Sequence, residues 1–199
     1  MKIAITGGIG SGKSYVSRHL EKRGISVYDC DAAAKRLMRS SLELRRRLIQ
    51  LVGDAVYSDE GILQKRVLAE FLLASEANKM AVNDVVHPAV AADFVASGME
   101  WLESAILFES GFHRRVAFDA VVCVVAPREV RIQRIMQRDA ISREKAAQWI
   151  DAQICQEEVA KRSGFCIVND GHIDIDSQID KCMMWLNGIR RNITENIII

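Results

Sequence analysis

The chain has 199 residues, of which 49% are hydrophobic and 27% charged, which is the balance of a globular protein with enough apolar residues for a proper core. The net charge of +1 gives no global attraction for nucleic acid or an anionic membrane, so any bound anion must be held locally. We expect neither a secretory signal nor a spanning helix, because no apolar run is long enough. The five cysteines are scattered without a Cys-x-x-Cys pair, which favours reduced thiols in the cytoplasm.

Strand-like runs alternate with helical stretches along the chain. In chain order, strands are predicted at residues 2–6, 25–28, 101–108, 120–125 and 165–168, with helices at 14–23 and 177–191 among the stretches between and after them. The run 120–125 shows no alternation of polar and apolar residues, as expected of a parallel strand covered by helices on both faces. Strands separated by helices predict an α/β fold with a mainly parallel sheet.

Between residues 32 and 98 only helical periodicity is found. An apolar stripe at Val67, Leu68, Phe71 and Leu72 predicts one helix, after a turn at 59–61. Pro88 is expected to interrupt the next helix. The sequence therefore predicts a helical insertion of about 32–99 in a core made of 1–31 and 100–199. The C-terminal Ile197–Ile199 is given no functional role.

Residues 7–14, Gly7-Gly8-Ile9-Gly10-Ser11-Gly12-Lys13-Ser14, match the phosphate-binding pattern G-x-x-x-x-G-K-[ST] in full, between an apolar strand and a helix. The glycines let the backbone turn tightly, so that successive N–H groups and the positive end of the helix form an anion site. Lys13 is expected to reach the β- and γ-phosphates of ATP, and the Ser14 hydroxyl to bind Mg²⁺. The alternative is a glycine-rich turn that binds nothing, which the lysine, the serine and both flanking elements disfavour.

The rest of the sequence favours a small-molecule kinase over other nucleotide-binding proteins. No guanine-reading Asn-Lys-x-Asp and no Asp-x-x-Gly switch after a strand are present. Arg131, Arg134 and Arg138 share one face of a helix, followed by a break with Ser142 as a candidate N-cap. Another face, expected to pack against the sheet, carries Ile132, Ile135 and Met136. We predict a lid of about 134–150, in which Arg138 neutralises the γ-phosphoryl group; a solvated charged face is the alternative.

Two carboxylates, Asp29 and Asp31, follow the second predicted strand, at the edge where open parallel sheets place their active sites. In phosphoryl transfer to an alcohol, a carboxylate orients the hydroxyl and accepts its proton. Alternation puts both residues on one side, so periodicity does not choose between them. Asp31 also precedes a good helix at 32–37, which makes capping of that helix its structural alternative.

With these pieces placed, the sequence resembles the dephospho-coenzyme A (dephospho-CoA) kinases over nearly its whole length. The motifs that carry the resemblance are, in chain order, Thr6–Ser14, Asp29–Asp31, His87-Pro88, Leu107–Glu109, Arg134–Asp139, Gln153 and Asn169–Gly171. The resemblance implies transfer of the ATP γ-phosphate, with Mg²⁺, to the ribose 3′-hydroxyl of dephospho-CoA. It also implies a three-layer P-loop kinase fold with a five-stranded, mainly parallel sheet, a helical substrate domain and a lid.

The same resemblance implies roles for individual residues. Asp31 is the leading base, with Asp29 second, and Lys13 and Arg138 act on the transferred group. ATP contacts are implied for Gly8, Gly10, Ser11, Gly12, Lys13, Ser14, Tyr15, Arg138 and Asn169, the last beside the adenine. Acceptor contacts are implied for Asp29, Asp31, Lys65, His87 and Glu109. A helix end with a structural histidine is an equally good explanation of His87-Pro88.

Several positions depart from the family pattern. Tyr15 replaces a small hydroxyl residue, and Lys65 replaces an arginine, which exchanges a planar fork for a point charge. Ala105 stands at a common proline position, and Ser163-Gly164 where Ala-Asp usually precedes the last strand. Two alternatives stay open: another small-molecule kinase acting on a sugar, a shikimate-like acid or a nucleotide, and a non-catalytic ATP sensor that signals by lid closure.

Overall fold

The structure, a computed structural model, describes residues 1–197, without the side chains of residues 193, 196 and 197. Ile198 and Ile199, the end of the isoleucine tail, lie outside the described residues. The chain divides into two compact units. The core unit consists of residues 1–28, 99–109 and 117 onward, and the helical unit of residues 29–98 and 110–116.

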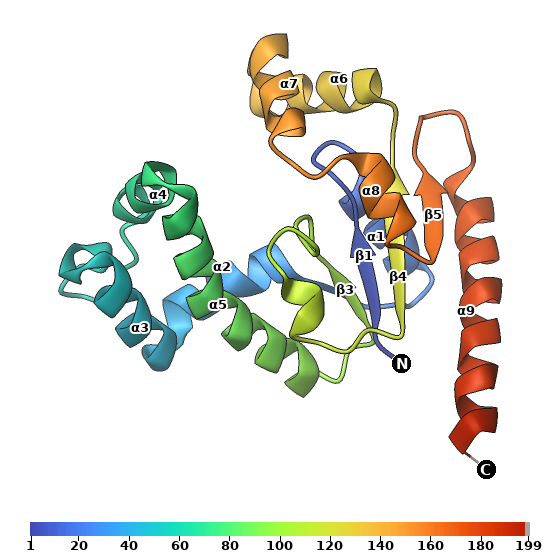
Figure 1. Cartoon of the computed structure of the whole chain (residues 1–199), viewed down its shortest axis with the longest axis horizontal. Helices are drawn as coiled ribbons and strands as arrows, with labels where there is room; N and C mark the ends of the chain where they lie inside the picture. Colours follow the sequence, from blue (N-terminus) through green and yellow to red (C-terminus); the bar gives the residue numbers. More distant parts are fainter. Residues whose placement is uncertain (198–199) are drawn as a thin grey trace. The chain divides into compact units, whose positions relative to one another are not determined.

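A five-stranded, all-parallel sheet forms the centre of the core unit (Figure 1). Its strands lie in the order β2 (Val27–Asp29), β3 (Trp101–Glu103), β1 (Ile3–Thr6), β4 (Ala120–Val125) and β5 (Phe165–Val168). In the register, Ile3 of β1 lies opposite Trp101 of β3 and Ala120 of β4. All four residues of β1 are buried, as the uniformly apolar strands predict for a sheet covered on both faces.

Helices α1 (Lys13–Lys22) and α9 (Ile175–Ile197) pack against one face of this sheet. Val16 and Leu20 of α1, and Ile179 of α9, join strand residues such as Val122 in one buried cluster. Figure 1 shows α9 running alongside β5. The first and last helices of the unit therefore fix the sheet from the same side.

The remaining helices of the core unit follow β4: α6 (Arg128–Asp139), α7 (Arg143–Asp151) and α8 (Gln156–Lys161). The expectation that the apolar face of α6 packs against the sheet is wrong. Ile132 and Ile135 instead form a separate buried cluster with Ala146 and Ile150 of α7, and Ile9 packs against it. The helix pair buries its apolar residues between its own members, because each helix has a narrow apolar stripe that the other can cover.

The helical unit contains α2 (Cys30–Ser40), α3 (Leu42–Val52), η1 (Asp54–Val56), α4 (Lys65–Ala74), α5 (Glu76–Ala96) and η2 (Phe112–Arg114). Its buried residues include Leu44, Leu48, Val86 and Phe94. The segment 110–116, which lies outside the predicted insertion, adds Phe112 to the unit, and Arg115 pairs with Asp84 at 2.6 Å. Within this unit the structure describes helices and one isolated β-bridge between Tyr57 and Leu63.

The second strand and the closing helix have other ends than predicted, at Val27–Asp29 and Ile175–Ile197, and two further predictions are wrong. The strand predicted at 101–108 ends at Glu103, because the apolar residues after it form turns; Leu107 is fully buried without being in a strand. Pro88 does not interrupt its helix, since α5 runs unbroken from Glu76 to Ala96. The buried stripe of Val82, Val86, Val90 and Phe94 continues across the proline and holds both halves in place. This packing outweighs the one backbone hydrogen bond that proline removes.

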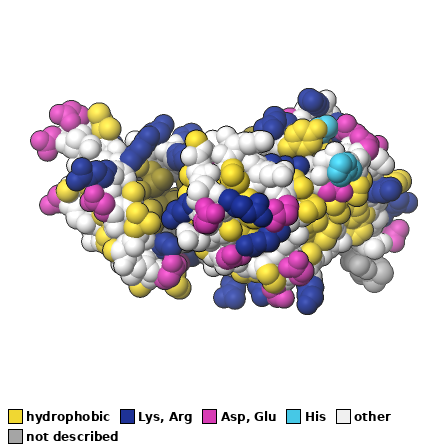
Figure 2. Space-filling view, turned by 90° about the horizontal axis from the view of Figure 1, so that it is seen from above, with side chains coloured by type: hydrophobic (Ala, Val, Ile, Leu, Met, Phe, Trp, Pro, Cys, Tyr) yellow, Lys and Arg dark blue, Asp and Glu magenta, His cyan; other side chains and the backbone are white. Residues whose placement is uncertain are grey.

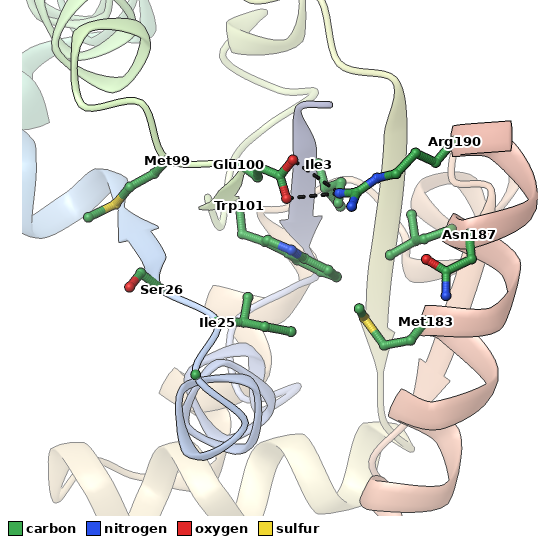
Figure 3. A pocket seen from close by; sticks show the side chains of 11 residues that line it. Ile3, Ile25, Ser26, Met99, Glu100, Trp101, Met183, Asn187 and Arg190 are labelled. Carbon is green, nitrogen blue, oxygen red and sulfur yellow. Dashed lines mark hydrogen bonds and ion pairs between the residues drawn. The ribbon is translucent and has the colours of Figure 1, made fainter. Parts of the chain in front are cut away.

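A cavity of about 350 Å³ lies near the start of β1 and is lined by residues of the core unit (Figure 3). Ile3, Trp101 and Met183 supply apolar walls, and Arg190 pairs with both carboxylate oxygens of Glu100 at 3.0 and 2.9 Å. The phosphate-binding loop follows the opposite end of β1, so this cavity is not part of that site. On the face drawn in Figure 2, acidic and basic side chains are interspersed, in keeping with the small net charge.

Candidate active site

The phosphate-binding loop, residues 7–14, connects β1 to α1. Gly10 and Gly12 have φ angles of 77° and 90°, a region that side chains other than glycine rarely adopt. No side chain caps the N-terminus of α1, so its first N–H groups are available to an anion. Lys13 is buried, with its Nζ donating to the carbonyl of Gly7 at 2.7 Å, and the buried Ser11 hydroxyl has no partner among the described residues.

Glu103, at the carboxyl end of β3, lies directly against this loop. Its Oε1 accepts from the Ser14 hydroxyl at 2.9 Å and its Oε2 from the Ser17 hydroxyl at 2.7 Å. A serine oxygen beside a carboxylate is a set of hard oxygen donors, the ligand type that Mg²⁺ and Ca²⁺ prefer. Glu103 is not among the predicted site residues, because the strand predicted at 101–108 places it inside the strand instead of at its end; the polar residue after Trp101-Leu102 is the signal that could have revealed it.

Arg131 and Gln153 fix the tip of the loop from the other side. Arg131 is only 5% exposed; its Nε donates to the carbonyl of Ile9 at 2.9 Å, while the N–H of Ile9 donates to Oε1 of Gln153 at 2.7 Å. A Cβ at Gly8 would collide with the Arg131 guanidinium. Burial lowers the pKa of Arg131, and the nearby charge of Arg128 adds to this effect. Ile9 is thus held through both its backbone polar groups.

Arg134 and Asn169 connect the end of β5 to the loop. Arg134 Nη1 donates to the Asn169 carbonyl at 3.0 Å and its Nη2 to Asn169 Oδ1 at 3.2 Å. The buried Asn169 Nδ2 in turn donates to the carbonyl of Ser11 at 3.0 Å. A Cβ at Gly12 would collide with the Asn169 amide. The predicted ATP-binding Asn169 is therefore locked beside the glycines and Lys13.

Arg138 differs from the two other arginines of α6. Its side chain is 60% exposed and pairs with the neighbouring Asp139 at 2.7 Å. After it, Ala140 has a φ of 51° and ends the helix, and Ser142 caps α7 by accepting from the N–H of Lys145 at 3.3 Å, as predicted. Arg131 and Arg134 thus already contact the loop, while Arg138 pairs with Asp139 at the end of the helix.

A cavity of about 570 Å³ opens beside Gly12, Arg134 and Asn169. Its other walls come from Tyr15 and His19 of α1 and from residues 171–175, which lead from β5 into the first residue of α9. Tyr15 is 44% exposed, and its ring lies 4.6 Å from the ring of His19, measured between centroids. Tyr15, the departure noted in the sequence, forms a flat apolar surface next to the phosphate-binding loop.

The two candidate bases lie at the start of α2. Asp29 is the N-cap, with Oδ1 accepting from the N–H of Ala32 at 2.9 Å. The structural alternative for Asp31, capping of this helix, is therefore wrong: α2 begins at Cys30, and Asp31 is in its first turn. Asp31 is exposed, and within the described residues its carboxylate has no hydrogen-bond or ion-pair partner. The structure thus gives the two aspartates different tasks.

The remaining candidates for contacts to the acceptor lie on different elements of the chain. Lys65 is the exposed first residue of α4, and Glu109 is exposed in the turns after β3. His87 lies in α5, its ring in a T-shaped arrangement with the ring of Phe112, 5.5 Å between centroids, and its buried Nδ1 has no hydrogen-bond partner among the described residues. Burial lowers the pKa of His87, and the charge of Arg115 adds to this effect. Asp29, Asp31, Lys65 and His87 belong to the helical unit, whereas Glu109 and the loop belong to the core unit.

No group of three or more His, Cys, Asp or Glu residues that could hold a metal ion occurs in the described part of the chain. None of the helices formed by residues 1–197 is long and apolar enough to cross a membrane.

A parallel sheet with a phosphate-binding loop after its central strand, a lysine and arginines around that loop, and helices on both sides defines a P-loop kinase. The model of the family described as "Dephospho-CoA kinase" matches residues 1–174. A dephospho-CoA kinase from Bacteroides fragilis is 42% identical, over 94% of this chain and 93% of its own length. The chain belongs to the dephospho-CoA kinase family and is an enzyme that uses ATP.

Solved structures agree with this fold. A crystal structure of a Thermus thermophilus protein has a TM-score of 0.75 and 32% identity, covering 92% of this chain and 96% of its own. The dephospho-CoA kinase from Campylobacter jejuni has a TM-score of 0.60 and 24% identity, covering 96% and 99% of the two chains. The second likeness establishes the fold only.

Proposed function

We propose that this protein transfers the γ-phosphate of ATP to the ribose 3′-hydroxyl of dephospho-CoA, giving CoA and ADP in the last step of CoA biosynthesis. The observation that carries the proposal is the family match over residues 1–174, which spans both the phosphate-binding loop and Asp31. The loop alone supports only nucleotide binding, because kinases with the same core fold phosphorylate unrelated acceptors.

The core unit supplies the nucleotide side of the reaction. The N–H groups of residues 8–14, with Lys13, hold the phosphates, and the cavity beside Tyr15 and Asn169 receives the adenine. Arg138, whose one partner among the described residues is the partly buried Asp139, is placed on the helix end that can close over the γ-phosphate. Positive charge from Lys13 and Arg138 stabilises the charge that spreads over the transferred group.

Mg²⁺ fits the oxygen donors beside the loop. We propose that the Ser14 hydroxyl holds the ion directly and that Glu103 holds it through water, the two being 2.9 Å apart in the structure. When bound, the ion neutralises charge on the phosphates of ATP. Ser17, whose hydroxyl donates to the other oxygen of Glu103, keeps that carboxylate oriented toward Ser14.

Asp31 is the proposed base. Asp29 already accepts the Ala32 N–H and so holds the start of α2, whereas the Asp31 carboxylate is exposed and unpaired in the described chain. Asp31 would orient the acceptor hydroxyl and take its proton as the phosphoryl group arrives. Asp29, Lys65, His87 and Glu109 are proposed to contact the acceptor, with the helical unit as the substrate-binding part and residues of about 134–150 as the lid.

A coupled assay of ADP release with a panel of acceptors tests the proposal. We expect turnover with dephospho-CoA and none with sugars, shikimate or nucleoside monophosphates. Turnover only with one of those acceptors would identify another small-molecule kinase. ATP binding without turnover on any acceptor would identify a sensor, which needs neither Asp31 nor an acceptor site. The five free cysteines favour a reducing compartment, so we place the reaction in the cytoplasm.

A further inference from the structure

Two cysteines that the proposed reaction does not use lie opposite each other in the sheet. Cys123 of β4 and Cys166 of β5 are direct partners in the parallel register, and their sulfur atoms are 2.9 Å apart. Val122, Val124 and Ile167 belong to the cluster that packs on α1 and α9, so alternation places both cysteines on the other face of the sheet. Neighbouring strands lie about 4.8 Å apart, which is within the Cα separation that a disulfide bridges.

The two thiols differ in exposure. Cys123 is fully buried, and burial raises its pKa to about 12, whereas Cys166 is exposed on β5, at the edge of the sheet. An oxidant in solution can therefore reach Cys166 but not Cys123. Because a disulfide bond is about 2.05 Å long, the sulfur atoms need to approach by less than about 1 Å. An edge strand, bonded to a neighbour on one side only, can make that shift.

We propose that Cys123 and Cys166 are a site of oxidative modification, where peroxide converts the two thiols to a disulfide between β4 and β5. The Cys166 thiolate attacks one peroxide oxygen, so that an S–O bond forms, the O–O bond breaks and hydroxide leaves. The Cys123 sulfur then attacks the resulting sulfenic acid: an S–S bond forms, the S–O bond breaks, and water leaves with the Cys123 proton. Two thiols lose two electrons in total, and hydrogen peroxide is reduced to two molecules of water.

The cross-link would act on the phosphate-binding loop through the strand ends. The N–H of Asn169, three residues after Cys166, donates to the carbonyl of Val125, two residues after Cys123, at 2.8 Å. Asn169 in turn holds Ser11 and Arg134. Drawing β4 and β5 together at the cysteines therefore moves Asn169 against the loop, and we expect a few-fold higher KM for ATP in the oxidised protein. The change in KM for ATP rests on the proposed nucleotide site, whereas the formation of the disulfide does not depend on the proposed function.

Peptide mapping tests the proposal directly, because trypsin places each cysteine in its own peptide. The full-length protein is treated with hydrogen peroxide, alkylated with N-ethylmaleimide, digested without reductant and analysed by mass spectrometry. We expect peptide 116–128 to be linked to peptide 163–181, at the summed mass less two hydrogens, and the link to disappear with dithiothreitol. Over-oxidised Cys166 without the link, a link from Cys166 to another cysteine, or no reaction at Cys166 would each overturn the proposal.

Two variants separate the pair from general thiol oxidation. Cys166→Ser changes an exposed side chain and should abolish the link, leaving Cys123 unmodified because peroxide cannot reach it. Cys155→Ser removes another exposed thiol, outside the proposed pair, and should leave the link unchanged. Peroxide should raise the KM for ATP in the parent protein and in Cys155→Ser, and this rise should be absent in Cys166→Ser. An equal rise in all three would mean that the disulfide is not its cause.

Discussion

The two units of this protein present their candidate residues in different states. In the core unit, Lys13, Ser14 and Asn169 are each held by hydrogen bonds to neighbours, and Arg131 and Gln153 fix the loop between them. In the helical unit, Asp31 and Lys65 are exposed at helix starts, without a partner among the described residues. The difference indicates a nucleotide site that is assembled before ligand arrives, and acceptor residues that gain partners only from the ligand.

The largest expected effect is that of removing Lys13 from the phosphate-binding loop. Lys13→Ala removes the positive charge from the phosphates in both ground and transition states, so KM for ATP should rise and kcat should fall. We expect kcat/KM to fall by about 10³-fold or more, measured by coupled ADP release. Lys22→Ala, an exposed lysine at the other end of α1, is the matched control and should keep normal kinetics. Unchanged kinetics of Lys13→Ala would contradict the assignment of the loop.

The second largest effect is expected at the proposed acceptor site, where the isosteric changes Asp31→Asn and Asp29→Asn are compared. Asp31→Asn should lower kcat by about 10²–10³-fold while ATP affinity is kept, because only the proton acceptor is lost. Asp29→Asn should have a much smaller effect, since asparagine caps a helix as well as aspartate does. Steady-state kinetics and ATP titration of both variants check this. If Asp29→Asn is the slower enzyme, the roles of the two aspartates are reversed.

A smaller effect is expected at Glu103, which the structure added to the nucleotide site. Glu103→Gln keeps the shape but replaces a charged oxygen, and the affinity for the divalent ion should fall by about 10–100-fold. Binding of Mn²⁺ followed by electron paramagnetic resonance, in the presence of ADP, measures this without turnover. Glu100→Gln, at the opposite end of the sheet, is the control. Equal Mn²⁺ affinity in Glu103→Gln and the parent protein would remove Glu103 from the site.

The smallest effect concerns the stability of the helical unit. Burial lowers the pKa of His87 in the folded chain, so between that pKa and the ordinary value of about 6.5 the unfolded chain binds more protons. Stability should therefore rise with pH across this window and level off above it. His87→Gln should reduce the loss of Tm between about pH 8 and about pH 5 by about 1–3 °C. His172→Gln, on an exposed loop, is the control; an equal loss in parent and His87→Gln would contradict a buried, neutral His87.

Much of the fold can be predicted from local patterns of apolar and turn-forming residues. The strands at 120–125 and 165–168 begin and end where predicted, because turns and helix starts border their apolar runs on both sides. The strand predicted at 101–108 is too long, since the apolar residues 105–108 are partly or fully buried in turns and periodicity does not distinguish such a turn from a strand. The prediction that Pro88 interrupts its helix is wrong for a related reason. Packing of α5 against distant residues keeps the helix continuous, against the local preference of proline.

The loop was recognised from its motif, but the residues that support it were not all visible. Arg131 and Arg134 share a helix face with Arg138, and only the fold shows that the first two contact the loop while the third pairs with Asp139. Glu103 is paired with Ser14 across 89 positions of the chain, a contact that spacing alone does not predict. Chemical groups that lie within one segment can be predicted from the sequence, whereas groups brought together by the order of strands are known only once the sheet is known.

The most direct measurement is the identity of the product formed from ATP and dephospho-CoA. The purified protein is incubated with both compounds and Mg²⁺, and the product is analysed by mass spectrometry and ³¹P nuclear magnetic resonance. We expect one added phosphate, located on the ribose 3′-oxygen, with an equal amount of ADP. A phosphate at another position, or ATP binding with no transfer to dephospho-CoA, would contradict this expectation.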